Sequence, residues 1–124
     1  MKPFRVIVAG SRSIHDEKLV FGKLDFFLSE KIKNAQPIQI ISGTAAGVDQ
    51  LGEAYAKARG FECLRYPADW NRFGKCAGYI RNIQMADHAD AAVVFWDGES
   101  PGSKHMIQVA QQKNLAVRII YCNR

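Results

Sequence analysis

Short apolar runs recur along this chain, and each one stops at a glycine, a proline or a polar residue. Five of these runs are rich in β-branched residues and have the length of a buried strand. No two of them are joined by a two-residue hairpin turn. The predicted strands are residues 4–9, 38–42, 61–66, 91–96 and 116–121.

Between these runs, apolar residues return every three or four positions, which predicts helices. The first helix begins at a cap, either Ser13 or Asp16, and continues to about residue 32. Ser103 is the expected cap of the last helix. We expect residues 68–76 to form a loop. The other predicted helices cover residues 48–58, 77–88 and 103–113.

Strands that alternate with helices predict a parallel sheet, because parallel neighbours need a crossover connection. We therefore expect one α/β domain over residues 1–124, with about five parallel strands and helices on both faces in three layers. In such sheets, ligands bind beyond the carboxyl ends of the strands, where the strand order reverses.

Three of the predicted strands run into glycine-containing loops that open a helix. Such loops allow close approach of a phosphate, and the helix N–H groups point at it. Because all three loops follow strands, they meet at one sheet edge and predict one composite site for a phosphate-bearing ligand. The ligand-binding candidates in these loops are Gly10, Ser11, Arg12, Ser42, Gly43, Thr44, Gly47, Asp49, Asp97, Gly98, Gly102 and Ser103.

Side chains near these loops suggest individual roles in the site. Arg12 suits bidentate contact with phosphate, and Arg81 on a predicted helix would neutralise charge, with Asn82 beside it. Asp49 would hold a ribose hydroxyl or cap its helix. Trp70, in a polar stretch, would stack on a base.

Catalytic patterns are sparse. The stretch after Gly10 lacks the further glycines of a dinucleotide fingerprint, and residues 42–49 lack the lysine of a P-loop. The candidate catalytic residues are Arg81, Asp97 and Glu99, and no pattern selects among the carboxylates. We therefore favour a binding protein over an enzyme.

Composition adds limits to this picture. The net charge of +5 comes from scattered basic residues, which favours solvated helix faces but is compatible with nucleotides or nucleic acid. Three cysteines and three histidines lack metal-site spacing, so we expect no metal, no cofactor and reduced thiols. No apolar run reaches the roughly 20 residues of a membrane span. We expect a cytoplasmic protein without a membrane partner.

Together, these motifs resemble the SLOG superfamily, which includes the Lonely Guy enzymes, the DNA-processing protein DprA and the YpsA-like proteins. The chain is most similar to the small YspA/YpsA-related family. The resemblance implies a Rossmann-like fold, a nucleotide or nucleotide-derived ligand at the carboxyl edge of the sheet, and homo-oligomers. The matching residues are 8–12, 42–49, 67–70, 77–78, 81–82, 85, 97–98 and 102–103.

Two members of the superfamily suggest further activities. Arg81 matches an arginine of the Lonely Guy enzymes, but Met106 stands where their catalytic glutamate is expected and cannot act as an acid or base. The stretch 42–49 is similar to a DprA pattern, and DprA-like proteins bind single-stranded DNA.

These considerations leave three functions in order of preference. The first is a sensor or binding module for a nucleotide or an NAD- or ADP-ribose-like molecule. The second is a phosphoribohydrolase-like enzyme that cleaves an N-glycosidic bond, with Asp97 or Glu99 in place of the missing glutamate. The third is binding of single-stranded nucleic acid through the basic surface.

Overall fold

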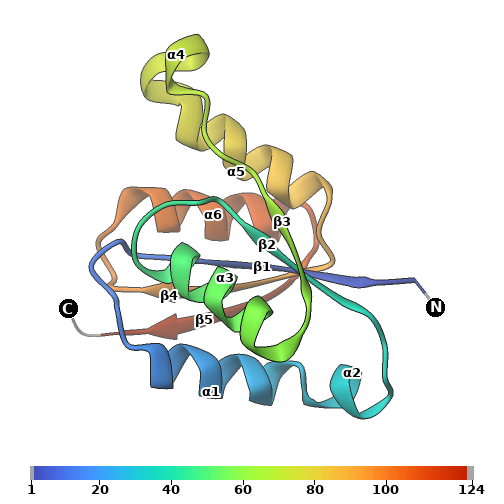
Figure 1. Cartoon of the computed structure of the whole chain (residues 1–124). Helices are drawn as coiled ribbons and strands as arrows, with labels where there is room; N and C mark the ends of the chain where they lie inside the picture. The colour runs from blue at the N-terminus through green and yellow to red at the C-terminus, as the bar shows by residue number, and fades with distance from the viewer. Residues whose placement is uncertain (1, 123–124) are drawn as a thin grey trace.

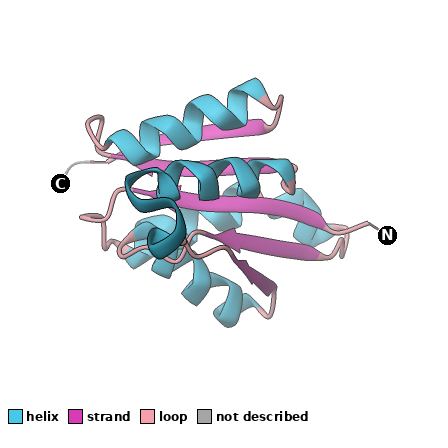
Figure 2. Cartoon of the chain, turned by 90° about the horizontal axis from the view of Figure 1, so that it is seen from above, coloured by secondary structure: helices cyan, strands magenta, loops and turns pink. Residues whose placement is uncertain are grey.

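A computed structural model, which describes residues 2–122, contains a five-stranded sheet in which every neighbouring pair of strands is parallel (Figures 1 and 2). The strand order is β3-β2-β1-β4-β5. This confirms the expected Rossmann-like α/β fold, and all five strands lie where the sequence predicts them. Their bounds are β1 Phe4–Gly10, β2 Ile38–Ser42, β3 Glu62–Arg65, β4 Ala91–Trp96 and β5 Ala116–Tyr121.

Helices cover both faces of the sheet, which makes three layers (Figure 1). Helices α1 (Glu17–Phe27) and α3 (Val48–Arg59) pack on one face, and α5 (Ala77–Asp87) and α6 (Pro101–Gln112) pack on the other. Each face forms its own apolar core because successive strand residues point to opposite sides.

Strand β4, which lies between β1 and β5, shows how this alternation divides the core. Val93 and Phe95 belong to the core under α1 and α3, whereas Ala92 and Val94 belong to the core under α5 and α6. All four side chains are fully buried. An apolar run without polar interruptions is therefore what a strand covered on both faces requires.

The first predicted helix is divided in two, so the expectation of one helix to residue 32 is wrong. Helix α1 ends at Phe27 and a short helix, α2 (Ser29–Lys33), follows. The break coincides with Ser29, whose hydroxyl donates a hydrogen bond to the Phe26 carbonyl at 2.9 Å. Asp16 caps α1 by accepting from the Leu19 N–H, so Ser13 is not the cap.

Residues 68–76 are not a plain loop, which corrects a second expectation. They include helix α4 (Trp70–Phe73) and a 3₁₀ turn, η1 (Gly74–Cys76). The Asp69 carboxylate caps α4 by accepting from the Arg72 N–H at 3.1 Å. This segment extends from the body of the domain at the amino end of α5 (Figure 1). We call residues 69–76 the arm.

Helix α6 begins two residues earlier than predicted, so Ser103 is not its cap. Pro101 occupies the first turn, where its missing N–H is not needed, and Ser100 is the N-cap residue. Ser103 instead lies inside the first turn and is only 6% exposed. This shift turns Ser103 toward the sheet edge rather than along the helix axis.

Strand order reverses between β1 and β4, since the chain adds strands on one side of β1 and then returns to add β4 and β5 on the other. In open parallel sheets, this point creates a crevice beyond the carboxyl ends of the strands. Within residues 2–122, no helix combines the length and apolar character needed to cross a membrane.

Two mid-helix glycines provide a matched test of this packing. A Cβ at Gly52 would lie 2.8 Å from Val8 Cβ, whereas a Cβ at Gly22 would meet nothing within 4 Å. We expect Gly52→Ala to lower the free energy of unfolding by about 1–2 kcal/mol through overpacking. Gly22→Ala should raise it by about 0.5–1 kcal/mol, since alanine favours helix. Urea titration of both variants measures this, and equal stabilisation by both would contradict the packing of α3 on β1.

Candidate functional site

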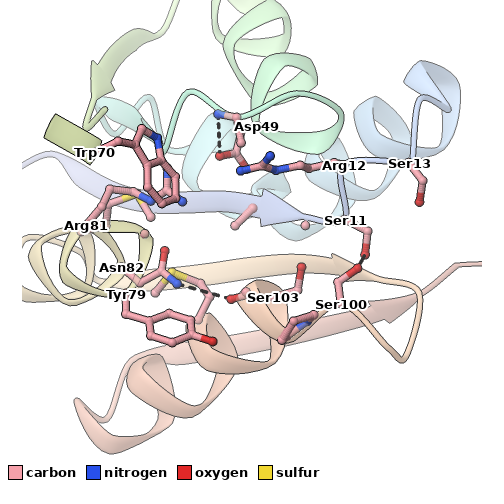
Figure 3. Close-up of a pocket in the computed structure, with 18 of the residues that line it drawn as sticks. Ser11, Arg12, Ser13, Asp49, Trp70, Tyr79, Arg81, Asn82, Ser100 and Ser103 are labelled. Atoms are coloured by element: carbon pink, nitrogen blue, oxygen red, sulfur yellow. Dashed lines mark hydrogen bonds between the residues drawn. The ribbon is translucent and has the colours of Figure 1, made fainter. Parts of the chain in front are cut away.

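A cavity of about 480 Å³ opens at the switch point of the sheet (Figure 3). Its lining comes from the loops after β1, β2 and β4 and from α3, α5, the arm and the first turn of α6. Cavities of this size hold small organic ligands. Its lining comprises Ala9, Gly10, Ser11, Arg12, Ser13, Ala45, Asp49, Trp70, Lys75, Gly78, Tyr79, Arg81, Asn82, Met85, Ser100, Pro101, Gly102, Ser103 and Met106.

The loops after β1 and β4 are joined through Ser11, which is 1% exposed. Its N–H donates to the Phe95 carbonyl at 3.0 Å, and its hydroxyl accepts from the Asp97 N–H at 3.1 Å. The Ser100 hydroxyl lies 3.0 Å from the Ser11 hydroxyl (Figure 3). Gly10 permits this junction, because a Cβ there would lie 2.2 Å from the Phe95 carbonyl oxygen.

The glycine-rich loop after β2 uses its polar groups internally. The Thr44 N–H donates to the Ser42 hydroxyl, and the Ala45 N–H donates to the Asp49 carboxylate, both at 3.1 Å. Gly47 has a φ of +77°, and a Cβ there would lie 2.5 Å from the Arg12 carbonyl oxygen. These contacts brace the loop against its neighbours and use the N–H groups of Thr44 and Ala45 within the loop.

Arg81 ties α5 to this loop. Its guanidinium donates a hydrogen bond through Nη1 to the Gly43 carbonyl. Its Nε–H is buried and has no acceptor among the described residues. Burial lowers the pKa of Arg81 from its usual value, and the nearby Asp49 carboxylate partly opposes that effect. An unpartnered buried donor costs about 1–3 kcal/mol, which an acceptor supplied by a ligand would offset.

Asp49 is a carboxylate in the cavity wall and is 5% exposed. Burial raises its pKa to about 6, against the hydrogen bond from Ala45 and the charges of Arg81 and Arg12. The Arg12 side chain reaches over the cavity toward it (Figure 3). Asp49 does not cap α3, whose N-cap residue is Gly47. Its titration therefore changes the charge of the cavity near neutral pH.

The first turn of α6 supplies hydrogen-bond donors. Its N-cap side chain, Ser100, makes no cap bond and is held instead by the Asp97 carboxylate at 2.9 and 3.0 Å. The Gly102 and Ser103 N–H groups belong to the turn that has no partner within the helix. Since both residues line the cavity, this helix end favours a negatively charged ligand group.

Two aromatic rings stand at the entrance. Trp70, on the arm, is 52% exposed, and Tyr79, on α5, is 46% exposed. A Cβ added at Gly78 would lie 3.5 Å from the Trp70 ring and 3.6 Å from Arg81 Nη2, so the indole and the guanidinium flank the same glycine. A planar ligand group at the entrance would find an aromatic face beside a cation.

The structure brings nine of the sequence-predicted residues together around the cavity. They are Gly10, Ser11, Arg12, Asp49, Trp70, Arg81, Asn82, Gly102 and Ser103. The other candidates do not line it, although several support residues that do. These are Ser42, Gly43, Thr44, Gly47, Asp97, Gly98 and Glu99.

One of the predicted carboxylates of the β4 loop, Asp97, stabilises the turn before α6. Asp97 Oδ1 accepts from the N–H groups of Glu99 and Ser100, each at 2.8 Å, which closes a tight turn before α6. Asp49 is the acidic side chain of the described cavity lining.

Sequence reasoning missed several lining residues, chiefly Lys75, Tyr79 and Ser100. Tyr79 lies three positions before Asn82, so helical periodicity from Asn82 could have placed both on one face. Lys75 had no such signal, because the arm was expected to be a loop. Among residues 2–122, no cluster of His, Cys, Asp or Glu side chains could hold a metal ion.

Fold and cavity place this chain in a general class: Rossmann-like domains with a cavity at the carboxyl edge of a parallel sheet. The model of the YspA, cpYpsA-related SLOG family matches residues 4–73, more than half of the chain. The chain belongs to this family, which confirms the family expectation from the sequence.

Two known proteins extend this comparison. The chain is 31% identical over 119 residues to the gene 61 protein of Mycobacterium phage D29, covering 91% of this chain and 93% of the phage protein. Its structure is similar to that of DNA processing protein A (DprA) from Streptococcus pneumoniae, with a TM-score of 0.70, 19% identity and 94% of this chain covered. The match spans 50% of the DprA chain, and at this identity it establishes the fold alone.

The raised pKa of Asp49 predicts a characteristic pH dependence of stability. Between its ordinary value of 3.8 and about 6, the folded protein binds more protons than the unfolded chain. The contribution of Asp49 to the free energy of unfolding therefore falls as pH rises through this window. Asp49→Asn keeps an acceptor for the Ala45 N–H but does not titrate. Relative to wild type, the free energy of unfolding of this variant should rise by about 2 kcal/mol between pH 4 and pH 7. Urea titration at each pH measures this difference.

Asp25→Asn is the matched control for this measurement. The Arg59 hydrogen bond lowers the pKa of Asp25, so the stabilisation by its carboxylate is lost as pH falls. Asp25→Asn should therefore lose stability relative to wild type as pH rises. A flat difference between Asp49→Asn and wild type would show that Asp49 titrates normally.

Proposed function

We propose that this chain binds a nucleotide or a nucleotide-derived anion, of the NAD- or ADP-ribose-like kind, in the cavity at the carboxyl edge of the sheet. The observation that carries the proposal is the convergence of three cationic side chains, Arg12, Lys75 and Arg81, with the first turn of α6 around one cavity. We treat residues 1–124 as one nucleotide-binding domain acting as a sensor or binding module.

The charge of the lining supports a phosphorylated ligand. Three cations line the cavity against one acid, Asp49. With the pKa of Asp49 at about 6, part of its negative charge is removed in mildly acidic solution. Guanidinium groups and helix N–H groups both suit phosphate oxygens, and here they lie around the same space.

The exposed Trp70 ring at the cavity entrance supports a ligand that also carries a planar group. The Trp70 ring is half exposed, although it lies on a capped helical turn next to the cavity. Exposed tryptophan rings in this setting stack on bases and gain about 1–3 kcal/mol per base. A base at the entrance and a phosphate at α6 describe a nucleotide.

Hydrolysis of an N-glycosidic bond has less support from the geometry. Asp97 and Glu99, the proposed replacements for the missing glutamate, do not line the cavity, and Met106 does. A thioether cannot transfer a proton. Asp49 is held by the Ala45 N–H in the cavity wall, where it balances arginine charge. We therefore favour binding over turnover.

Single-stranded nucleic acid is the alternative binding partner. Its support is the structural similarity to DprA, which concerns the fold, together with the net charge of +5. A strand would need a continuous basic path outside the cavity. A mononucleotide needs the cavity residues alone, and this difference can be tested.

Replacing a cavity arginine should weaken nucleotide binding selectively. We expect Arg12→Gln to lower the affinity for AMP and for ADP-ribose at least about tenfold, because a charge-assisted hydrogen bond contributes about 1.5–3 kcal/mol. Isothermal titration calorimetry measures this. The control is Arg72→Gln, which removes an equal charge from the arm at a residue outside the lining.

The two variants separate the cavity from the general surface charge. Equal weakening by Arg12→Gln and Arg72→Gln would contradict a cavity site. Tight binding of an oligonucleotide, weakening steeply with salt, without any binding of AMP or ADP-ribose, would assign the function to nucleic acid instead.

Trp70 should contribute to binding of the base and not to binding of the sugar phosphate. We expect Trp70→Ala to weaken AMP binding about fivefold or more while leaving the affinity for ribose 5-phosphate unchanged. Trp70→Phe should retain most of the AMP affinity. Phe26→Ala, at a 74% exposed ring outside the cavity lining, is the control for loss of an aromatic group. If Trp70→Ala weakened the binding of AMP and of ribose 5-phosphate equally, Trp70 would have a structural role instead.

A further inference from the structure

Asn82 is a buried amide held between two helices at the cavity wall. It lies on α5 and is 5% exposed. Its Nδ2 lies 3.3 Å from the Gly102 carbonyl oxygen and 3.1 Å from His105 Nδ1, both on α6. The amide therefore connects α5 to the helix end that would hold the phosphate.

These two contacts determine which way the amide faces. The Gly102 carbonyl can only accept a hydrogen bond, so the NH₂ group of Asn82 must point toward α6. Its second hydrogen then points at His105 Nδ1, which must be the unprotonated ring nitrogen. Both amide hydrogens are used, and the amide cannot turn over without losing them.

His105 is suited to keep this orientation. Burial lowers the pKa of the imidazole below its usual value, which favours the neutral ring that an accepting Nδ1 requires. The Tyr79 ring packs against it with the ring centres 4.3 Å apart. His105 does not line the cavity, so it acts on a ligand only through Asn82.

The amide oxygen is left for the cavity. Within residues 2–122, Asn82 Oδ1 accepts no hydrogen bond, and it is not among the fully buried atoms that lack a partner. Figure 3 shows this oxygen turned away from the bond to α6. Arg12, Lys75, Arg81 and the first turn of α6 line the same cavity and present donors. Asn82 Oδ1 is thus a fixed acceptor in a cavity that also holds several donors.

The position of Asn82 along α5 indicates which ligand group it meets. Trp70 lies beside Gly78, one helical turn before Asn82, and Gly102 lies directly beside Asn82. One turn advances the helix by about 5.4 Å. With the base at Trp70 and the phosphate at the N–H groups of Gly102 and Ser103, the sugar lies between them, along the side of α5 that runs from Gly78 to Asn82.

We propose that Asn82 Oδ1 accepts a hydrogen bond from a sugar hydroxyl of the ligand, and that this contact makes the cavity selective for ribonucleotides over deoxyribonucleotides. His105 is the positioning residue that keeps the acceptor facing the cavity. The proposal rests on the proposed function, and it deepens it by naming the sugar as the group that is selected.

The test compares AMP with 2′-deoxy-AMP and 3′-deoxy-AMP by calorimetry on the full chain. Wild type should bind AMP about tenfold more tightly than at least one deoxy analogue, because removing the hydroxyl leaves a buried acceptor without a partner. Asn82→Leu should abolish this preference, because it lowers the affinity for AMP and leaves the affinity for the deoxy analogue almost unchanged. The ligand and the substitution thus form a double-mutant cycle.

His105→Phe provides a second variant that keeps a ring against Tyr79 and leaves Asn82 in place. Without Nδ1 the amide loses one of its two fixed bonds, so the preference for AMP should fall several-fold. His88→Phe is the matched control, since His88 also packs on a tyrosine, Tyr66, but lies outside the cavity lining. It should leave the preference unchanged.

Each outcome decides between the two proposals. Equal binding of AMP and both deoxy analogues by wild type would overturn this inference and leave the proposed function intact. Equal weakening of all three ligands by Asn82→Leu would also overturn it, because Asn82 would then only support the fold. If Asn82→Leu changed the preference for AMP over inosine monophosphate and left the preference for AMP over both deoxy analogues unchanged, Asn82 would contact the base and this inference would be overturned. Failure of every nucleotide to bind wild type would overturn both proposals.

Discussion

The cavity depends on one contact, the hydrogen bond from the Arg81 guanidinium to the Gly43 carbonyl. It joins α5, which packs on one face of the sheet, to the loop that leads into α3 on the other. Asn82 joins the same helix to α6 through Gly102 and His105, so α5 is fixed over the strand ends from both sides of the cavity. Arg81 therefore supports the cavity and also lines it. It lies near Asp49, whose pKa is raised by burial.

This dual role explains why the loop after β2 differs from a phosphate loop. Its glycines allow chain segments to approach one another: Gly43 meets Arg81 and Asp49, and Gly47 meets the carbonyl of Arg12. The first turn of α6 lines the cavity instead, and its N-cap serine, Ser100, is held by the Asp97 carboxylate. The glycine-rich stretch thus supports the cavity wall through Asp49 and Arg81.

Sequence patterns predicted the strands well, because apolar runs such as residues 91–96 are interrupted at both ends by polar or glycine residues. Helix ends were less predictable, since they depend on individual side chains: Asp16 rather than Ser13 caps α1, and Pro101 starts α6 early. At the candidate site, the pattern identified loops that line the cavity or support its wall, but not which of their atoms are used internally. That distinction depends on hydrogen bonds such as those of Asp49 and Ser42, which no spacing in the sequence reveals.

The arm has a consequence for how such a domain can diversify. It is inserted between β3 and α5, extends from the body, and contributes Trp70 and Lys75 to the cavity without joining either apolar core. The length and residues of the arm can therefore vary without altering the strand order or the two cores. Under the proposed function, substitutions in the arm would therefore change which ligand binds more than they change the stability of the fold. Under the proposed function, related chains would keep Arg12, Arg81 and the first turn of α6 and vary the arm residues that face the rest of the ligand.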